Sequence, residues 1–101
     1  MSLDQEQAAH AATIAAVAIR RQLPARAVSI ALAAALQESD LRNLDYGDRD
    51  SLGLFQQRPS QGWGDPDQVQ DPIYAANRFY DALVQIPGYQ QLPITEAAQR
   101  V

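Results

Sequence analysis

LQESDLRNLDYGDRDSLGLFQQRP, residues 36–59, is the stretch that decides how this chain is built. It places Glu38 at the end of an alanine-rich segment, passes through an aspartate-rich loop and returns to an apolar turn, GLFQ, at residues 53–56. A carboxylate at a helix end, followed by a polar loop and a short apolar turn, favours a concave site that contains titratable groups. The pairing of Glu38 and Ser39 with the GLFQ turn is therefore the first candidate for a functional site.

Composition favours a small helical domain. The chain has 101 residues, which is the size of one domain. Its 18 alanines and 13 glutamines lose little on entering a helix. We expect a single domain over residues 1–101 that is mainly α, with little or no β structure.

Charge and cysteine content exclude several classes of function. The net charge is −4 and all eight basic residues are arginine, so the chain offers no cationic surface for nucleic acid. The absence of cysteine removes disulfides, thiolate nucleophiles and zinc–thiolate sites. The longest apolar run, residues 30–36, is far shorter than the roughly 18 residues of a membrane span. We expect neither a nucleic-acid partner nor a membrane span in this chain.

Two helices are predicted before the key stretch. Asp4 and Gln7 have the spacing of a capping box, which predicts a helix over residues 5–22. Its expected buried stripe consists of Ala12, Ala15, Ala16 and Ile19. His10 has no other ligating side chain nearby and is expected to face solvent. Pro24 suits the first turn of a second helix, which extends to Ser39.

Glu38 is the sharpest candidate for chemistry. Three alanines lie one and two turns before it on the same helix face: Ala31, Ala34 and Ala35. The alternative is a solvated glutamate with no role. The negative end of the helix dipole disfavours a carboxylate at this position, which favours a functional reading.

The aspartates after Glu38 allow three interpretations. Asp40, Asp45, Asp48 and Asp50 can supply a second catalytic acid, a cation site, or only turn hydrogen bonds. A calcium loop that starts at Asp45 would need a glycine at its sixth position and a glutamate at its twelfth, and both are missing. No metal is therefore expected. Gly47 is expected to supply a positive φ in this loop.

Aromatic and basic side chains near the stretch can bind a ligand or simply build the protein. The aromatic candidates for stacking on a flat ring are Tyr46, Phe55, Trp63 and Tyr74. Trp63 stands out because flanking glycines place it in a loop. Arg42 and Arg58 can orient an anion or remain solvated. Ser39 is a poor nucleophile, since distant His10 is the only group available to activate it.

The last third of the chain is also predicted to be helical. One helical turn is expected at residues 67–69. Asp71 and Pro72 are typical of a helix start, and an amphipathic stripe then continues as far as Pro87-Gly88. Its apolar members are Ile73, Ala76, Phe79, Tyr80, Leu83 and Val84. A final short helix is predicted from Thr95.

Two motifs together resemble a known family. Glu38-Ser39 ends a helix, and Gly53-Leu54-Phe55-Gln56 follows after a polar loop, with Pro59 close behind. This arrangement is similar to the soluble lytic transglycosylase and goose-type lysozyme group of the lysozyme-like superfamily, whose second motif is Gly-Leu-Met-Gln. The segment GDRDSLGLFQQRPSQGWG looks closer still to a transglycosylase-like subgroup of the bacterial envelope. The resemblance covers residues 8–101.

The resemblance implies a fold, a substrate and roles for particular residues. It implies a lysozyme-like helical domain that cleaves peptidoglycan at the β-1,4 bond from N-acetylmuramic acid to N-acetylglucosamine, without a cofactor. Glu38 would act as general acid and base, and Ser39 and Gln56 would support the acid or the sugar. The implied location is the cell envelope or outside the cell, although no signal peptide is recognisable in this chain.

Other activities fit the same motifs. A transglycosylase needs one carboxyl, whereas an inverting hydrolase needs a second carboxylate about 6.5–9.5 Å away. Asp48 and Asp50 are the nearby options for that second group. A noncatalytic glycan-binding domain and a plain helical interaction module are further alternatives. The family also has a tyrosine-bearing helix beyond the point that matches Val101, so we expect the domain to be truncated at its C-terminus and to belong to a longer protein.

Overall fold

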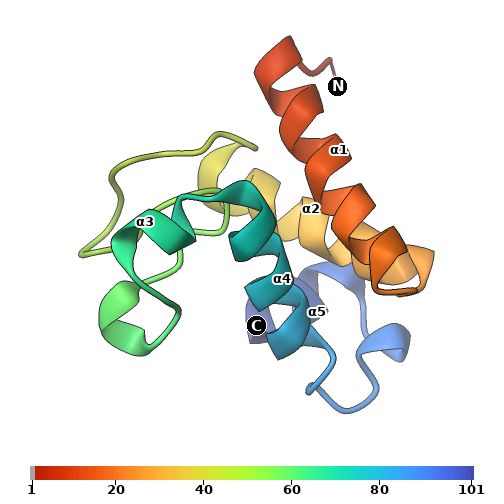
Figure 1. Ribbon diagram of the computed structural model, residues 1–101. Helices are drawn as coiled ribbons and strands as arrows, with labels where there is room; N and C mark the ends of the chain where they lie inside the picture. The colour runs from red at the N-terminus through yellow and green to blue at the C-terminus, as the bar shows by residue number, and fades with distance from the viewer. Residues whose placement is uncertain (1) are drawn as a thin grey trace.

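A computed structural model describes residues 2–101 and is mainly helical, as predicted (Figure 1). Five α-helices and two short 3-10 turns follow one another in the order α1 Gln5–Arg20, α2 Ala25–Ser39, η1 Pro59–Gln61, α3 Pro66–Val69, α4 Pro72–Leu83, η2 Tyr89–Gln91 and α5 Ile94–Arg100. Within residues 2–101, β structure is limited to an isolated antiparallel bridge between Leu52 and Gln57.

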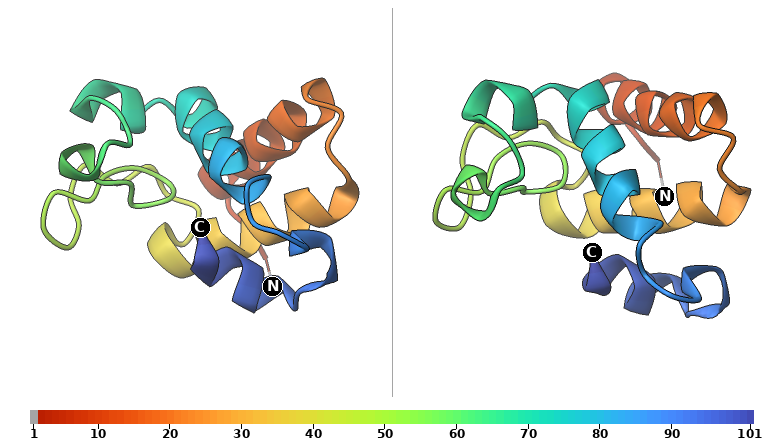
Figure 2. Two further views of the ribbon diagram at one scale, coloured as in Figure 1. Left: turned by 90° about the horizontal axis from the view of Figure 1, so that it is seen from below. Right: turned by 60° about the horizontal axis from the view of Figure 1, so that its bottom comes forward.

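Helix α2 is the centre of the structure. It packs against α1, α4 and α5, and α1 also packs along α4. Figure 2 shows α2 lying between α1 on one side and α5 on the other. The loop that follows α2 projects to the side of the helices and returns through α3 to α4 (Figure 1). The C-terminal end of α2, which carries Glu38, therefore lies where the loop and α5 both approach it.

Capping residues set the helix starts that the sequence predicts. The capping box at α1 is confirmed: the Gln7 N–H donates to Asp4 Oδ1 at 2.8 Å, and the Asp4 N–H donates to Gln7 Oε1 at 3.1 Å. Asp71 caps α4 by accepting the Ile73 N–H at 3.0 Å. These contacts involve residues two or three positions apart, so the local sequence is enough to predict them.

The predicted buried stripe of α1 is wrong. Ile19 is 73% exposed, and the helix instead buries Ile14, Val17 and Ala18. This face removes more apolar area from water than the alanine stripe would. It also places the Ile14 carbonyl 2.9 Å from the Tyr80 hydroxyl of α4, which donates to it. Burial of that hydroxyl raises the pKa of Tyr80.

The prediction that His10 faces solvent is wrong. Its side chain is half-buried, because α1 contacts the segment at the end of α2 there. Its Nδ1 lies 2.7 Å from the Leu41 carbonyl oxygen, and the Gln7 amide donates to the Asp40 carbonyl at 2.8 Å. Asp40 and Leu41 both have positive φ, at 57° and 58°, so the chain turns sharply just after Glu38. The side chains of Gln7 and His10 thus bind the Asp40 and Leu41 carbonyls, which such a helix end leaves without helical partners.

Helix α4 supplies most of the large side chains in the core. Phe79, Tyr80 and Leu83 are buried as predicted, whereas the ends of the expected stripe are not: Ile73 is 56% exposed and Val84 is 38% exposed. None of the helices that the structure describes is long and apolar enough to cross a membrane.

Candidate functional site

The GLFQ turn is fastened to the last turn of α2. Ser39 is 6% exposed, and its hydroxyl donates to the Leu54 carbonyl at 2.7 Å. Two backbone hydrogen bonds between Leu52 and Gln57, of 3.0 and 3.1 Å, close the turn from the other side. The turn therefore holds its side chains at a fixed place beside Glu38.

Gly47 makes room for the side chain of Gln56. The predicted positive φ at Gly47 is wrong, since the positive φ values among the described glycines are at other positions. A Cβ at Gly47 would instead lie 1.8 Å from Gln56 Oε1 and 2.8 Å from the Ser51 carbonyl oxygen, which is part of the backbone and cannot move aside as a side chain can. The Gln56 amide nitrogen also donates to the carbonyls of Tyr46 and Gly53, at 3.2 and 3.1 Å. Glycine is therefore needed here for close approach rather than for backbone conformation.

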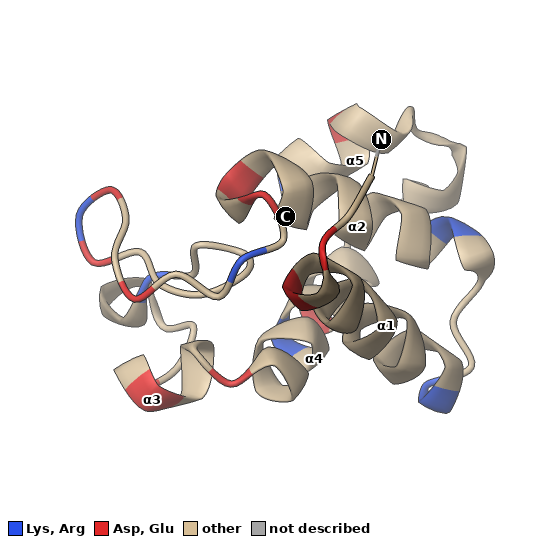
Figure 3. Ribbon diagram, turned by 90° about the horizontal axis from the view of Figure 1, so that it is seen from above, with Lys and Arg blue, Asp and Glu red and all other residues tan. Residues whose placement is uncertain are grey.

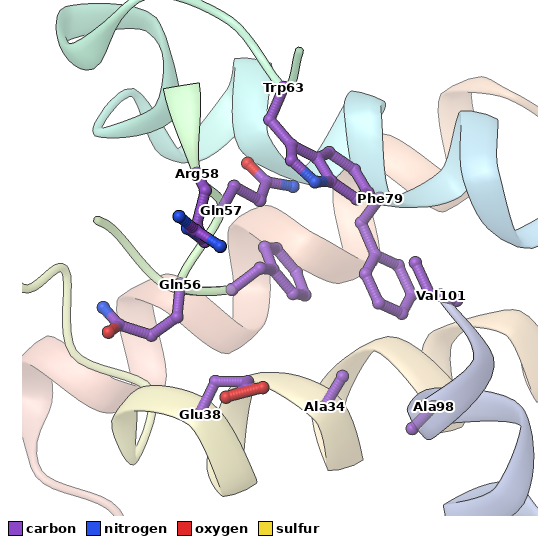
Figure 4. Close-up of a pocket in the computed structure, with 10 residues that line it drawn as sticks. Ala34, Glu38, Gln56, Gln57, Arg58, Trp63, Phe79, Ala98 and Val101 are labelled. Atoms are coloured by element: carbon purple, nitrogen blue, oxygen red, sulfur yellow. The ribbon is translucent and has the colours of Figure 1, made fainter. Parts of the chain in front are cut away.

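A cavity of about 180 Å³ lies between the end of α2, the GLFQ turn, α4 and α5 (Figure 4). An apolar cavity of about 150 Å³ holds one benzene molecule, so this cavity has room for about one six-membered ring. Its lining residues are Ala34, Glu38, Phe55, Gln56, Gln57, Arg58, Trp63, Phe79, Ala98 and Val101.

Glu38 stands on the rim of this cavity. It is exposed, and Ala34, one turn earlier, continues the same wall (Figure 4). A second hollow of about 110 Å³ lies between α2 and α5 and also includes Glu38, together with Thr95 and Ala98. Glu38 is the only acidic side chain on either wall within residues 2–101. A ligand that spans both hollows would therefore pass this single carboxyl.

Aromatic side chains form the far wall. Phe55 stacks on Phe79 with ring centroids 4.7 Å apart and is 7% exposed, so most of its ring serves the core. Trp63 is half-buried, and the Arg78 guanidinium carbon lies 5.6 Å from its ring centroid. The Tyr74 hydroxyl donates to the Trp63 carbonyl at 3.1 Å, so Tyr74 supports the tryptophan loop without lining the cavity.

The structure brings together four of the predicted site residues: Glu38, Phe55, Gln56 and Trp63. Ser39 and Tyr46 were predicted to contact a ligand, but neither lines the cavity. The Ser39 hydroxyl is buried and bonded to the backbone, so its part is to hold the turn. Tyr46 is 66% exposed, and its backbone carbonyl holds Gln56 instead.

The candidate second carboxylates lie away from the cavity. Asp48 is exposed in the loop, where its backbone carbonyl accepts the Ser51 N–H. Figure 3 shows acidic residues at the outer part of this loop, away from the end of α2. Asp50 accepts the Arg58 Nε–H at 2.7 Å and the Ser60 N–H at 2.8 Å. The Arg58 guanidinium, followed by Ser60, holds the pKa of Asp50 well below its usual range.

The Asp50 carboxylate predicts a pH effect on stability. Its pKa is lower in the folded than in the unfolded chain, so its contribution is complete above the unfolded value of about 3.9 and is lost as the pH falls below it. Asp50→Asn lacks this contribution, and we expect its unfolding free energy to fall less than that of the wild type between pH 5 and pH 2. Urea unfolding across that range is the measurement. If the unfolding free energy falls equally with pH in the two proteins, Asp50 does not have the lowered pKa described here.

Several cavity residues are not predicted from the sequence as site residues. Gln57 is 3% exposed, and its amide donates to the Ala75 carbonyl of α4 at 3.0 Å. Ala98 and Val101 reach the cavity because α5 packs on α2. No local pattern could have identified them, since their place depends on contacts between distant segments. Arg42, a candidate for binding an anion, instead pairs with Asp4 at 2.7 Å.

Comparison with known proteins adds no family to this description. Neither a protein-family model nor a curated protein sequence matches the chain. Among residues 2–101, no three His, Cys, Asp or Glu side chains are grouped as a metal site would need. The interpretation of the cavity therefore starts from its own side chains.

Proposed function

We propose that this chain is a lysozyme-like domain that cleaves peptidoglycan glycan strands as a lytic transglycosylase. Glu38 protonates the glycosidic oxygen between N-acetylmuramic acid and N-acetylglucosamine. The same carboxylate then takes the proton of the muramoyl 6-hydroxyl, whose oxygen attacks C1 and closes a 1,6-anhydro ring. No water is consumed, so one carboxyl completes the cycle.

The observation that carries this proposal is the solitary position of Glu38. It is the one acidic side chain on the wall of a ring-sized cavity in the described part of the chain. Asp50 is committed to Arg58, and Asp48 does not line the cavity. A hydrolase of the inverting type needs a second carboxylate about 6.5–9.5 Å from the first to activate water. The arrangement therefore supports the one-carboxyl mechanism over the two-carboxyl mechanism.

The remaining cavity residues fit a sugar ligand. Trp63 offers an apolar face at one side, and the Gln57 amide, whose nitrogen donates to the Ala75 carbonyl, lies close to it (Figure 4). A small number of polar groups on an aromatic-lined wall is typical of carbohydrate and other ring-shaped ligands.

The mass of the products tests the proposal. Digestion of purified peptidoglycan is expected to release muropeptides that end in 1,6-anhydro-N-acetylmuramic acid, each lacking one water relative to a hydrolytic product. Mass spectrometry with and without borohydride reduction makes the measurement, because only reducing ends gain hydrogen. Reducing ends would indicate a muramidase that uses a further aspartate. Sugar binding without any product would indicate a glycan-binding domain.

A further inference from the structure

Within residues 2–101, the cavity beside Glu38 has one basic side chain on its wall, Arg58. Glu38 comes from α2, and Arg58 comes from the segment that follows the GLFQ turn, on the other side of the space (Figure 4). A ligand ring that fills the cavity therefore meets one negative and one positive side chain. A guanidinium binds a carboxylate more strongly than a neutral hydroxyl, so Arg58 would favour a sugar that carries an acidic group over a neutral sugar.

Arg58 is held in place before any ligand binds. Its Nε donates to Asp50 Oδ1 at 2.7 Å, and Asp50 Oδ2 accepts the Ser60 N–H at 2.8 Å. The Arg58 side chain is 33% exposed, and its Nη2 makes only a long contact of 3.4 Å with the Ser60 hydroxyl. Its Nη1 donates to no protein atom in residues 2–101. Two terminal donors are thus oriented and available, which suits a carboxylate.

We propose that Arg58 makes the site selective for muramoyl rings that carry a free lactyl carboxylate. The identity of the sugar rests on the proposed function. The cavity holds about one ring, so the recognised anion must be attached to the ring that occupies it. In a glycan strand the lactyl carboxylate is joined directly to the muramoyl ring, whereas the carboxylates of a stem peptide lie at least one amino acid farther out. Attachment of that peptide also converts the lactyl carboxylate into a neutral amide.

Binding of three tetrasaccharides tests the proposal. The ligands are a peptide-free N-acetylglucosamine–N-acetylmuramic acid repeat, the same glycan with stem peptides, and neutral chitotetraose. Calorimetry is performed on Glu38→Gln protein so that no ligand is cleaved. We expect the peptide-free glycan to bind roughly tenfold more tightly than the other two at low salt, with the preference shrinking as salt is added.

Arg58→Gln in the same background is expected to reduce this preference to about twofold or less, and Arg58→Lys to restore part of it. Arg49→Gln is the matched control, because Arg49 is exposed in the preceding loop, does not line the cavity and loses the same charge. It should keep the full preference. Thermal unfolding of each variant separates loss of recognition from loss of fold.

Three results would overturn the proposal: equal binding of all three ligands, a preference that survives Arg58→Gln, or no binding at all. Tighter binding of the peptide-bearing glycan that depends on Arg58 would assign the anion to the stem and reject the lactyl carboxylate. Product analysis of the wild type judges the proposed function separately. Arg58-dependent binding without cleavage would reject the proposed function but keep the selectivity. Cleavage without a binding preference would reject only the selectivity.

Discussion

Replacement of Glu38 by glutamine is expected to lower the rate of peptidoglycan cleavage by roughly 10²- to 10⁴-fold, the usual contribution of a general acid and base. Glutamine keeps the size of the side chain but can neither give a proton to the glycosidic oxygen nor take one from the muramoyl hydroxyl. Glu38 forms no ion pair within residues 2–101, and it is exposed. Its replacement should therefore leave the fold intact. Release of soluble muropeptides over time is the measurement.

Glu96→Gln is the matched control for that experiment. Glu96 is also an exposed helical glutamate, but it pairs with Arg100 at 2.9 Å and lines neither hollow. Its replacement should leave the rate within about twofold of the wild type, since exposed ion pairs contribute little. Circular dichroism and thermal unfolding should be unchanged for both variants. Release of muropeptides by Glu38→Gln at the wild-type rate would remove Glu38 from the mechanism.

Features that depend on neighbouring residues were predictable from the sequence. The start of α1 follows from Asp4 and Gln7, and the start of α4 from Asp71 and Pro72. In each case a side chain satisfies a backbone donor two or three positions away, so the information is local. The position of Glu38 near the end of α2, with Ala34 on the same wall, was predictable for a similar reason, because both residues lie on one helix.

Features that depend on packing were not predictable in the same way. Ile19 and Ile14 both fit a helical stripe, and only contact with α4 decides that Ile14 is the buried one. The role of Ser39 in the site likewise depends on packing and not on local sequence. Its position next to Glu38 suggests contact with a ligand, but its hydroxyl donates to the Leu54 carbonyl of the GLFQ turn. Which polar groups remain available to a ligand is thus decided by tertiary contacts.

Gly53→Ala is expected to be the most destabilising single methyl substitution at the site. Gly53 has φ +82°, a conformation that costs an alanine roughly 1–2 kcal/mol. A Cβ there would also lie 2.2 Å from the Val69 carbonyl oxygen of α3, and relieving such overpacking costs about 1–3 kcal/mol more. The sum is a large share of the roughly 5–15 kcal/mol that stabilises a domain. Urea unfolding at neutral pH measures the loss.

Gly62→Ala separates the two causes, because Gly62 has a nearly equal φ of +85° and, apart from its chain neighbours, no atom of residues 2–101 lies within 4 Å of its Cβ position. It should lose only the conformational part, about 1–2 kcal/mol. Equal losses of unfolding free energy in the two variants would mean that the contact between residue 53 and α3 relaxes at little cost and does not constrain the turn. A larger loss of unfolding free energy in Gly53→Ala would mean that the packing of α3 against residue 53 constrains the turn that carries Phe55 and Gln56. In that case muropeptide release by Gly53→Ala should fall even below its unfolding temperature, because the cavity wall opposite Glu38 moves with the turn.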